Sequence, residues 1–355
     1  MKQAKLRRKE EMTDKLAAWN VREADFPTTG NPSDQLKFLL RYAILAPSGP
    51  NTQPWKFSIN ENEVSLIADF SRSLPSVDPT DRTLYISHGC LLTNLLVAAE
   101  HFGFGYDLKC LPEGLSGDRT AAVQFSKEPH EQKFPDLFPE ITKRHTNRMK
   151  YEDRAIEDDT LLRLKDCVKR DEFELDIVTD KEGKTEMADI LSRAHKIQLG
   201  NKTFRKELAS WVRPNTSDAM DGLPGYSFGY SDFESFFGSF IFGTFDMSTS
   251  RARIETSYMK QSPAVAVLST REEDKLTWIK TGVLLESLFL TATKLGVRFD
   301  LFSQPIAIPE LRHKMERILN AKYPQILIRM GYAEPSKHTP RRPVEDVLTK
   351  RIFIS

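Results

Sequence analysis

The sequence predicts an α+β protein made of two similar halves, each with an antiparallel-rich sheet flanked by helices. The main observation is an apolar helical stretch that occurs twice, because residues 88–108 and 281–301 align without a gap and agree at eight of 21 positions. In both copies a Gly closes the helix and an Asp-Leu pair follows, which fixes how the chain enters the next strand. Alternating apolar residues at 55–59 and 64–68 indicate a β-hairpin.

The first half, residues 1–135, begins with spaced apolar residues that predict a peripheral amphipathic helix over 1–20. Ser33 is the expected cap of a helix that ends at Ala46. The further expected elements are a hairpin around 60–62, a helix over 84–102 and strands over 106–111 and 121–125.

The second half, residues 136–355, is separated from the first by a linker near 130–145 that contains Pro129, Pro135 and Pro139. The expected elements are a helix from about Asp158, a strand over 173–178, one or two helices over 185–212, a strand over 264–268, the repeated helix and a β-rich run over 325–330.

Composition excludes several classes of function. Fifty-one basic and 50 acidic residues give a net charge of +1, which offers no argument for a nucleic-acid or membrane partner. No apolar run is long enough to span a membrane, and the amino-terminal residues lack a secretory pattern, so a cytoplasmic protein is expected. Three distant cysteines, Cys90, Cys110 and Cys167, predict neither a disulfide framework nor a metal site.

The loop from Ala46 to Trp55 is the most informative stretch. Three prolines and one glycine forbid a helix there, while Ser48, Asn51 and Gln53 place short polar groups where they could bind a flat polar ligand. The alternative is an ordinary connection from a helix to a strand.

This loop, between a helix and a strand, resembles the Pro-Ser-Ser-x-Asn-x-Gln-Pro-Trp-like run of the flavin-dependent nitroreductase family. The resemblance implies a nitroreductase-like fold in which the loop lies against the isoalloxazine ring of FMN. It also implies that Pro47, Ser48, Asn51 and Gln53 contact the cofactor. Because these enzymes are usually two-fold dimers, a duplicated chain would form an intrachain pseudo-dimer and could be a monomer.

A basic element, Arg144-His-Thr-Asn-Arg148, opens the second half and offers the charges and the hydroxyl that a phosphate needs. A solvated basic loop is the alternative. The element resembles the Arg-Arg-Ser-x-Arg start of nitroreductase subunits. By that match, Arg144, His145 and Thr146 would lie near the phosphate and the ribityl chain, and Arg148 near flavin N1 and O2.

Two later segments also match the family. Phe302, Ser303 and Gln304 fall where nitroreductases approach flavin N5, and Arg341 and Arg342 lie in a segment like the basic tail that completes the phosphate site. The first half has only Arg22 where a second basic element would stand, so one whole site and one eroded site are expected. His88 and His195 are expected to be structural or surface residues.

An insertion at about 213–258 contains nine Phe or Tyr residues between Tyr226 and Phe245, and aromatics at this density are expected to be buried. It is interpreted as a lid or a piece of the interface between the halves, with a plain core segment as the alternative. Asp221-Gly-Leu-Pro224, together with the stretch before it, resembles the mycobacterial Acg-type subgroup, in which such an insertion covers the flavin.

The resemblance implies an FMN-dependent oxidoreductase that takes hydride from NAD(P)H and reduces a nitro compound or a quinone. The flavin carries that chemistry, so no catalytic residue of the chain is assigned. The alternative function is a flavin-binding or flavin-sequestering protein without turnover, its cofactor covered by the lid.

Overall fold

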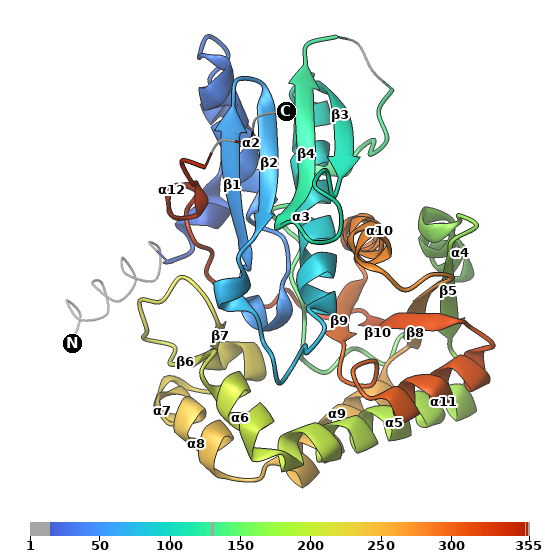
Figure 1. Cartoon of the computed structure of the whole chain (residues 1–355). Coiled ribbons are helices and arrows are strands. Elements are labelled where there is room, and N and C mark those ends of the chain that lie inside the picture. Colours follow the sequence, from blue (N-terminus) through green and yellow to red (C-terminus); the bar gives the residue numbers. More distant parts are fainter. Residues whose placement is uncertain (1–14, 129–130, 352, 354–355) are drawn as a thin grey trace.

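The computed structural model describes residues 15–128, 131–351 and 353. It contains two four-stranded antiparallel sheets, one for each half of the chain (Figure 1). The strands of the first are β1 (Trp55–Asn60), β2 (Glu63–Ala68), β3 (Gly105–Cys110) and β4 (Arg119–Ser126), and those of the second are β5 (Phe173–Val178), β8 (Ala264–Thr270), β9 (Arg298–Phe302) and β10 (Tyr323–Gly331). The predicted α+β class is confirmed.

Both sheets have the same topology. Their strand orders are β1-β2-β4-β3 and β5-β8-β10-β9, so in each sheet the fourth strand in the chain lies between the second and the third. In each half a 20-residue helix joins the second strand to the third: α3 (Arg82–His101) and α10 (Lys275–Lys294). The repeat seen in the sequence is therefore a repeat of structure.

Helices α3 and α10 pack against each other at the centre of the molecule, where α10 is seen end-on in Figure 1. They meet at their repeated glycines. A Cβ atom on Gly89 would lie 2.0 Å from the carbonyl oxygen of Ile279, and one on Gly282 would lie 1.9 Å from that of Ile86. The two backbones approach so closely that no side chain fits between them.

The other helices flank this core. They are α2 (Pro32–Ala43), α4 (Asp158–Val168), α5 (Lys181–Gly200), α6 (Lys202–Ala209), α7 (Asp232–Phe236), α8 (Gly238–Thr244), α9 (Ser248–Gln261), α11 (Pro309–Leu319) and α12 (Val344–Val347). Two short strands, β6 (Val212–Arg213) and β7 (Leu223–Pro224), form a small parallel pair. No helix of the described part of the chain is both long and apolar enough to cross a membrane.

Several element ends differ from the prediction. The cap of α2 is Asn31, whose Oδ1 accepts a hydrogen bond from the Asp34 N–H at 2.9 Å, and Ser33 lies inside the helix. The helix ends at Ala43, three residues before the expected Ala46, and a turn follows. Residues 1–14 of the helix expected over 1–20 lie outside the described part, and a short 3₁₀ helix covers Ala17–Asn20.

The stretch over 185–212 forms two helices because Asn201 separates them. Its side-chain oxygen accepts hydrogen bonds from the N–H groups of Thr203 and Phe204, which caps α6 where α5 has just ended. Together with α7, α8 and α9 they form one long excursion between β5 and β8, which are neighbours in the sheet.

Residues 213–258 form the later part of this excursion, and α7 and α8 lie at its outer edge (Figure 1). The expectation that its aromatic residues are buried is wrong for five of them: Phe233, Phe236, Phe237, Phe240 and Phe245 are 42–77% exposed. Helices α7 and α8 have only five and seven residues, so they turn few side chains towards the rest of the protein. Phe242 of α8 is one of these and packs against Ala209 and Val212.

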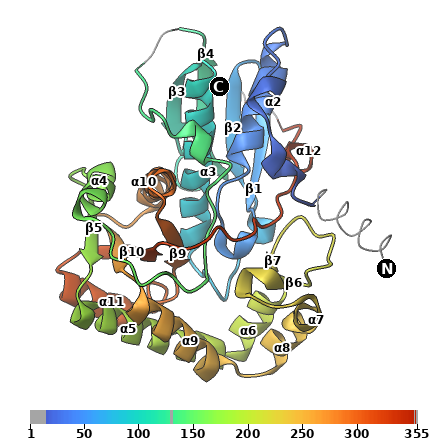
Figure 2. The ribbon, with the colours of Figure 1, turned by 180° about the vertical axis from the view of Figure 1, so that it is seen from behind.

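After β10 the chain leaves the second half and crosses to the first, where α12 ends beside β1 (Figure 2). Trp19 donates an Nε1–H hydrogen bond to the Thr339 carbonyl at 2.9 Å, and Thr349 N–H donates to the Phe57 carbonyl at 2.7 Å. This C-terminal crossing segment, residues 332–349, ties the halves together.

Candidate functional site

Two adjoining cavities lie where the first half, the second half and the insertion meet. The smaller, which we call the cationic cavity, measures about 40 Å³, and the larger, the apolar cavity, measures about 220 Å³. Five residues line both and form their shared wall: Pro47, Ser48, Thr146, Arg148 and Leu223.

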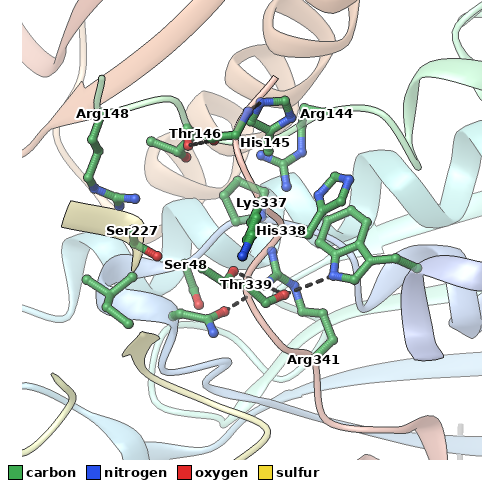
Figure 3. A pocket seen from close by; sticks show the side chains of 15 residues that line it. Ser48, Arg144, His145, Thr146, Arg148, Ser227, Lys337, His338, Thr339 and Arg341 are labelled. Atoms are coloured by element: carbon green, nitrogen blue, oxygen red, sulfur yellow. Dashed lines mark hydrogen bonds between the residues drawn. The ribbon is translucent and has the colours of Figure 1, made fainter. Parts of the chain in front are cut away.

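The cationic cavity collects four basic side chains from two distant segments: Arg144 and Arg148 precede α4, and Lys337 and Arg341 belong to the crossing segment (Figure 3). None of the described residues that line it is acidic. Glu286 of α10 stands behind it, with a carboxylate oxygen 3.0 Å from Arg144 Nε. One carboxylate cannot balance four cations, so the cavity favours an anion.

Some donors of this cavity are buried without a partner. Arg144 Nη1 and Arg341 Nε have no hydrogen-bond acceptor among the residues that the structure describes, although both side chains are buried. Burial and the nearby charge of Arg144 lower the pKa of Arg341 to about 9. Buried charged donors without acceptors are costly, and an anionic ligand would remove that cost.

Two histidines line the same cavity. Burial, and then the charges of Arg298 and Arg144, lower the pKa of His145 to about 4, while burial, His145 and the arginines lower that of His338 to about 3. His145 Nδ1–H donates to the Lys143 carbonyl at 2.9 Å, and its Nε2 accepts from the Ser336 N–H at 2.9 Å. Neutral His145 thus fixes the crossing segment against the basic element.

The apolar cavity lies between α3 and the insertion. Its wall includes Ile86 and Cys90 of α3, Leu285 of α10, Phe204 and Leu208 of α6, and Phe228 and Phe242 of the insertion. Polar groups from α5, α9 and the end of β9 lie at its margin: His195, Gln198, Arg251, Glu255, Asp300, Ser303 and Gln304. A flat molecule with an apolar ring and an anionic end would suit the two cavities together.

The structure brings most of the expected site residues together. Eight line the cationic cavity: Pro47, Ser48, Asn51, Arg144, His145, Thr146, Arg148 and Arg341. Phe302, Ser303 and Gln304 line the apolar cavity, together with the shared Pro47, Ser48, Thr146 and Arg148. Their roles toward a ligand stay predictions.

Gln53 and Arg342 line neither cavity. Gln53 is fully buried, and its Nε2 donates to the Met220 carbonyl at 2.8 Å while its Oε1 accepts from the Arg342 N–H at 2.8 Å. The Arg342 guanidinium turns to the Asp346 carbonyl at 3.0 Å. The two residues hold the insertion and the crossing segment to the loop that precedes β1.

Asn51 lines the cationic cavity and, like Gln53, also holds the insertion and the crossing segment by hydrogen bonds. Its Nδ2 donates to the Gly222 carbonyl at 2.8 Å, its own carbonyl accepts from the Gly222 N–H at 3.1 Å, and its Oδ1 accepts from Arg341 Nη1 at 2.9 Å. Its backbone φ of 63° lies in the left-handed region, which Asn tolerates better than most residues.

Seven residues of the cationic cavity were not among the expected site residues: Trp19, Leu223, Ser227, Ser336, Lys337, His338 and Thr339. Trp19 stacks on His338 with ring centroids 3.8 Å apart and lies under Arg341 at 4.9 Å. The basic tail at 339–343 was the only part of the crossing segment whose sequence indicated a place in the site. Nothing in the sequence links Trp19 to a histidine more than 300 positions later.

The insertion is fastened over the apolar cavity by polar contacts with the first half. Asp221 forms ion pairs with Arg72 at 3.0 Å and with Arg213 at 2.9 Å. The preceding helix α6 is also held to the first half, because Glu207 accepts hydrogen bonds from the N–H groups of Ser76 and Val77 at 2.9 and 2.7 Å. Leu223, Phe228 and Phe242 of the insertion form part of the cavity wall, and its role as a lid stays a prediction.

His88 and His195, which were expected to be structural or surface residues, lie in different environments. His88 is fully buried, with Nε2 2.9 Å from the Pro54 carbonyl and Nδ1 2.8 Å from Thr120 Oγ1. His195 is also buried but lines the apolar cavity, and its Nε2 has no partner among the described residues. In the described part of the chain, no cluster of three or more His, Cys, Asp or Glu side chains could hold a metal ion.

Comparison with known proteins identifies relatives over nearly the whole chain. It is 24% identical over 331 residues to a Mycobacterium tuberculosis protein provisionally named NAD(P)H nitroreductase Acg, an alignment that covers 92% of this chain and 98% of the relative. It is also 24% identical over 322 residues to Rv3131 of the same organism, which carries the same provisional description, with 89% of this chain and 91% of the relative covered. No protein-family model matches the chain.

Among solved structures, the FMN- and NADPH-dependent nitroreductase NfnB of Sphigopyxis sp. strain HMH matches 61% of this chain and 100% of its own, at 16% identity and a TM-score of 0.41. The FMN-dependent NfnB of Mycobacterium smegmatis, in complex with NADPH, matches 59% and 95%, at 14% identity and a TM-score of 0.38. Over nearly its whole length the chain is therefore similar to provisionally named NAD(P)H nitroreductases of the Acg type.

Proposed function

We propose that the chain binds one FMN between its two halves and acts as a flavin-dependent reductase. The observation that carries the proposal is the pairing of an acid-free cationic cavity with a larger apolar one, each built from both halves. FMN has the matching asymmetry, because a phosphate ends a chain that carries a flat, largely apolar ring.

Residues of this chain fit each part of the cofactor. Arg144, Arg341 and Lys337 would hold the phosphate, and the unpartnered N–H groups of the two arginines would gain acceptors. Pro47, Ser48, Thr146, Arg148 and the residues of 302–304 would hold the ring and the ribityl chain, since they line the shared wall and the apolar cavity.

Bound FMN would supply hydride chemistry between NAD(P)H and a nitro or quinone acceptor. The chain's own task is to orient the cofactor, surround it with fixed charge and exclude water through the insertion. The names of the Acg-type relatives and of the two NfnB enzymes support this reaction class.

A second candidate function is flavin sequestration without turnover, and the fastening of the insertion favours it. Asn51, Gln53 and Arg72 bind the insertion, and two backbone N–H groups of the first half bind Glu207 of the preceding helix α6. A nicotinamide ring must approach the flavin to within roughly 3–3.5 Å for hydride transfer, so a fixed cover would prevent reduction.

Titration of purified protein with FMN, followed by ultrafiltration and absorbance, tests the binding proposal. We expect a yellow protein with about one FMN per chain. Two equivalents would contradict the single site, and the absence of binding with excess FMN would overturn the proposal.

Stopped-flow reduction of the loaded protein separates the two functions. Rapid bleaching by NAD(P)H identifies a reductase, whereas bleaching by dithionite alone identifies a covered, sequestered flavin. Exchange of residues 213–245 for a short Gly-Ser linker should then speed reduction by NAD(P)H, provided that FMN stays bound.

A further inference from the structure

One end of the apolar cavity carries polar side chains from two helices that pack side by side, α5 and α9 (Figure 1). His195 and Gln198 are three residues apart on α5, and Arg251 and Glu255 are four apart on α9, so each pair occupies one face of its helix. All four line the cavity. We call this group the polar end.

The polar end offers hydrogen-bond acceptors that nothing in the described part of the chain uses. Glu255 Oε2 and Gln198 Oε1 are buried without a partner, as is Gln304 Oε1 at the end of β9. Glu255 is 5% exposed and Gln198 9%. Buried acceptors of this kind cost free energy unless a ligand or a water molecule donates to them.

The other oxygen of Glu255 is already occupied. Oε1 accepts from Arg251 Nη2 at 2.7 Å, and the Arg251 guanidinium lies 5.3 Å from the Phe228 ring. Asp300, paired with Arg329 at 3.0 Å, adds a second carboxylate to the wall. Both carboxylates are ion-paired, but an ionised carboxylate only accepts hydrogen bonds, so a ligand group that presents only oxygen lone pairs cannot bond to the free Glu255 Oε2.

The other side chains of the wall determine what kind of ligand can pack beside the polar end. The same cavity is lined by apolar side chains, among them Leu199, Phe204, Leu208, Phe228 and Phe242. An aromatic ring could pack there, provided that it carries a polar group at one edge.

We propose that the polar end binds the hydroxyl group of a small hydroxylated aromatic ligand, a phenol or a hydroquinone. Its O–H would donate to Glu255 Oε2, while its oxygen can accept from Arg251. A nitro group or a quinone carbonyl supplies acceptors alone and would leave Glu255 and Gln198 unsatisfied. The inference rests on the proposed function in one respect, since the ligand would share the cavity with the flavin ring.

Isothermal titration calorimetry of the full chain with three small aromatics tests this preference. The probes are 4-methylphenol, 4-nitrotoluene and toluene, each titrated into the protein as purified and after saturation with FMN. We expect 4-methylphenol to bind at least about tenfold more tightly than either of the others, because a charge-assisted hydrogen bond distinguishes them.

Glu255→Gln is the decisive variant, because the shape is kept and the free acceptor can become an amide donor. The advantage of 4-methylphenol over 4-nitrotoluene should fall about tenfold. Glu310→Gln is the matched control, since Glu310 is an exposed acid 3.8 Å from Arg193, and it should keep the wild-type preference. If Glu255→Gln fails to fold, Gln198→Leu removes a second acceptor and should reduce the same ratio.

Equal affinity for 4-methylphenol and 4-nitrotoluene in the wild-type protein would overturn the inference, as would a preference that survives the variants. Failure of the proposed function has a different signature, because FMN would then not bind while the protein without FMN still selects the phenol. A tighter 4-nitrotoluene complex would assign the cavity to nitro compounds and refute the hydroxyl preference directly.

Discussion

Gly89 and Gly282 occupy equivalent positions in the two halves and touch each other: a Cβ atom on Gly89 would lie 2.7 Å from the Gly282 Cα. Each glycine thus leaves room for the equivalent glycine of the other half. The contact joins the helices on which both sheets rest, and the adjoining residues Ile86 and Cys90 line the apolar cavity. The spacing of the halves, and with it the width of the cavity, depends on this pair.

Gly89→Ala should destabilise the protein by about 1–3 kcal/mol or more, because the added methyl group meets backbone atoms that have no room to yield. Chemical denaturation measures the effect. Gly200→Ala is the control, since a Cβ there meets no atom within 4 Å. Equal stability of the two variants would show that α3 and α10 can move apart freely.

Arg148→Ala should weaken FMN binding roughly ten- to a hundredfold, as expected for one charge-assisted contact. Arg22, which stands at the eroded position, is exposed and bonded to Asp25 at 2.8 Å, so Arg22→Ala should leave affinity unchanged. Fluorescence titration with FMN compares them. The same loss in both variants would mean that the wrong half was assigned to the site.

Arg144 is a poorer probe of binding than its sequence position suggests. It is buried against Glu286, and its removal would strand that carboxylate, which typically costs about 3–5 kcal/mol of stability. Burial already raises the pKa of Glu286 to about 7. Weak FMN binding by Arg144→Ala would therefore be uninformative without a measurement of folding.

Asp221→Ala should loosen the insertion, because Asp221 holds Arg72 from the first half and Arg213 from the insertion. Hydrogen exchange of amides within residues 214–245 should become about tenfold faster. Asp218→Ala is the control in the same loop, since its carboxylate is 95% exposed. Identical exchange in both variants would show that the ion pairs do not hold the lid.

Stability should fall in acid partly through His88. Burial lowers its pKa to about 4, despite the Pro54 hydrogen bond and the charge of Asp69, whereas an unfolded histidine titrates near 6.5. The unfolded chain therefore takes up the proton first. The contribution of His88 is complete above pH 6.5 and is lost as the pH falls from 6.5 towards 4.

Denaturation of His88→Gln across that range isolates the effect. The wild-type free energy of unfolding should fall more steeply than that of the variant, by up to about 1.4 kcal/mol per pH unit. His313→Gln, at an exposed position, serves as the control. Parallel curves for wild type and His88→Gln would contradict the argument.

The sequence was informative where a local pattern decides the structure. The hairpin over 55–68 followed from alternation, and Gly103 and Gly296, both at φ 76°, end the repeated helices as expected. The polar loop at 46–55 and the basic element at 144–148 lie about a hundred positions apart in the sequence. Their meeting in one site could still be predicted, because the duplication indicated which faces of the two halves would meet.

Contacts between residues far apart in the chain could not be predicted from the sequence. The amide of Gln53 could serve a ligand or a carbonyl, and only the folded insertion shows that it binds Met220. His195 looked structural because a lone histidine has no signature, and its place on the cavity wall depends on how α5 packs on α9. The exposed Phe233 and Phe236 defied the rule that dense aromatics are buried, since α7 is too short to turn both inward.

The crossing segment also sets an order of events during synthesis. The cationic cavity needs Trp19, then Arg144 and Arg148, and finally Lys337 and Arg341. At about 5–20 residues per second, the ribosome takes on the order of ten to forty seconds to travel from Arg148 to Arg341. Until then the polar loop and the basic element lack their last wall, so a ligand that requires all three segments is acquired only after translation has passed this point.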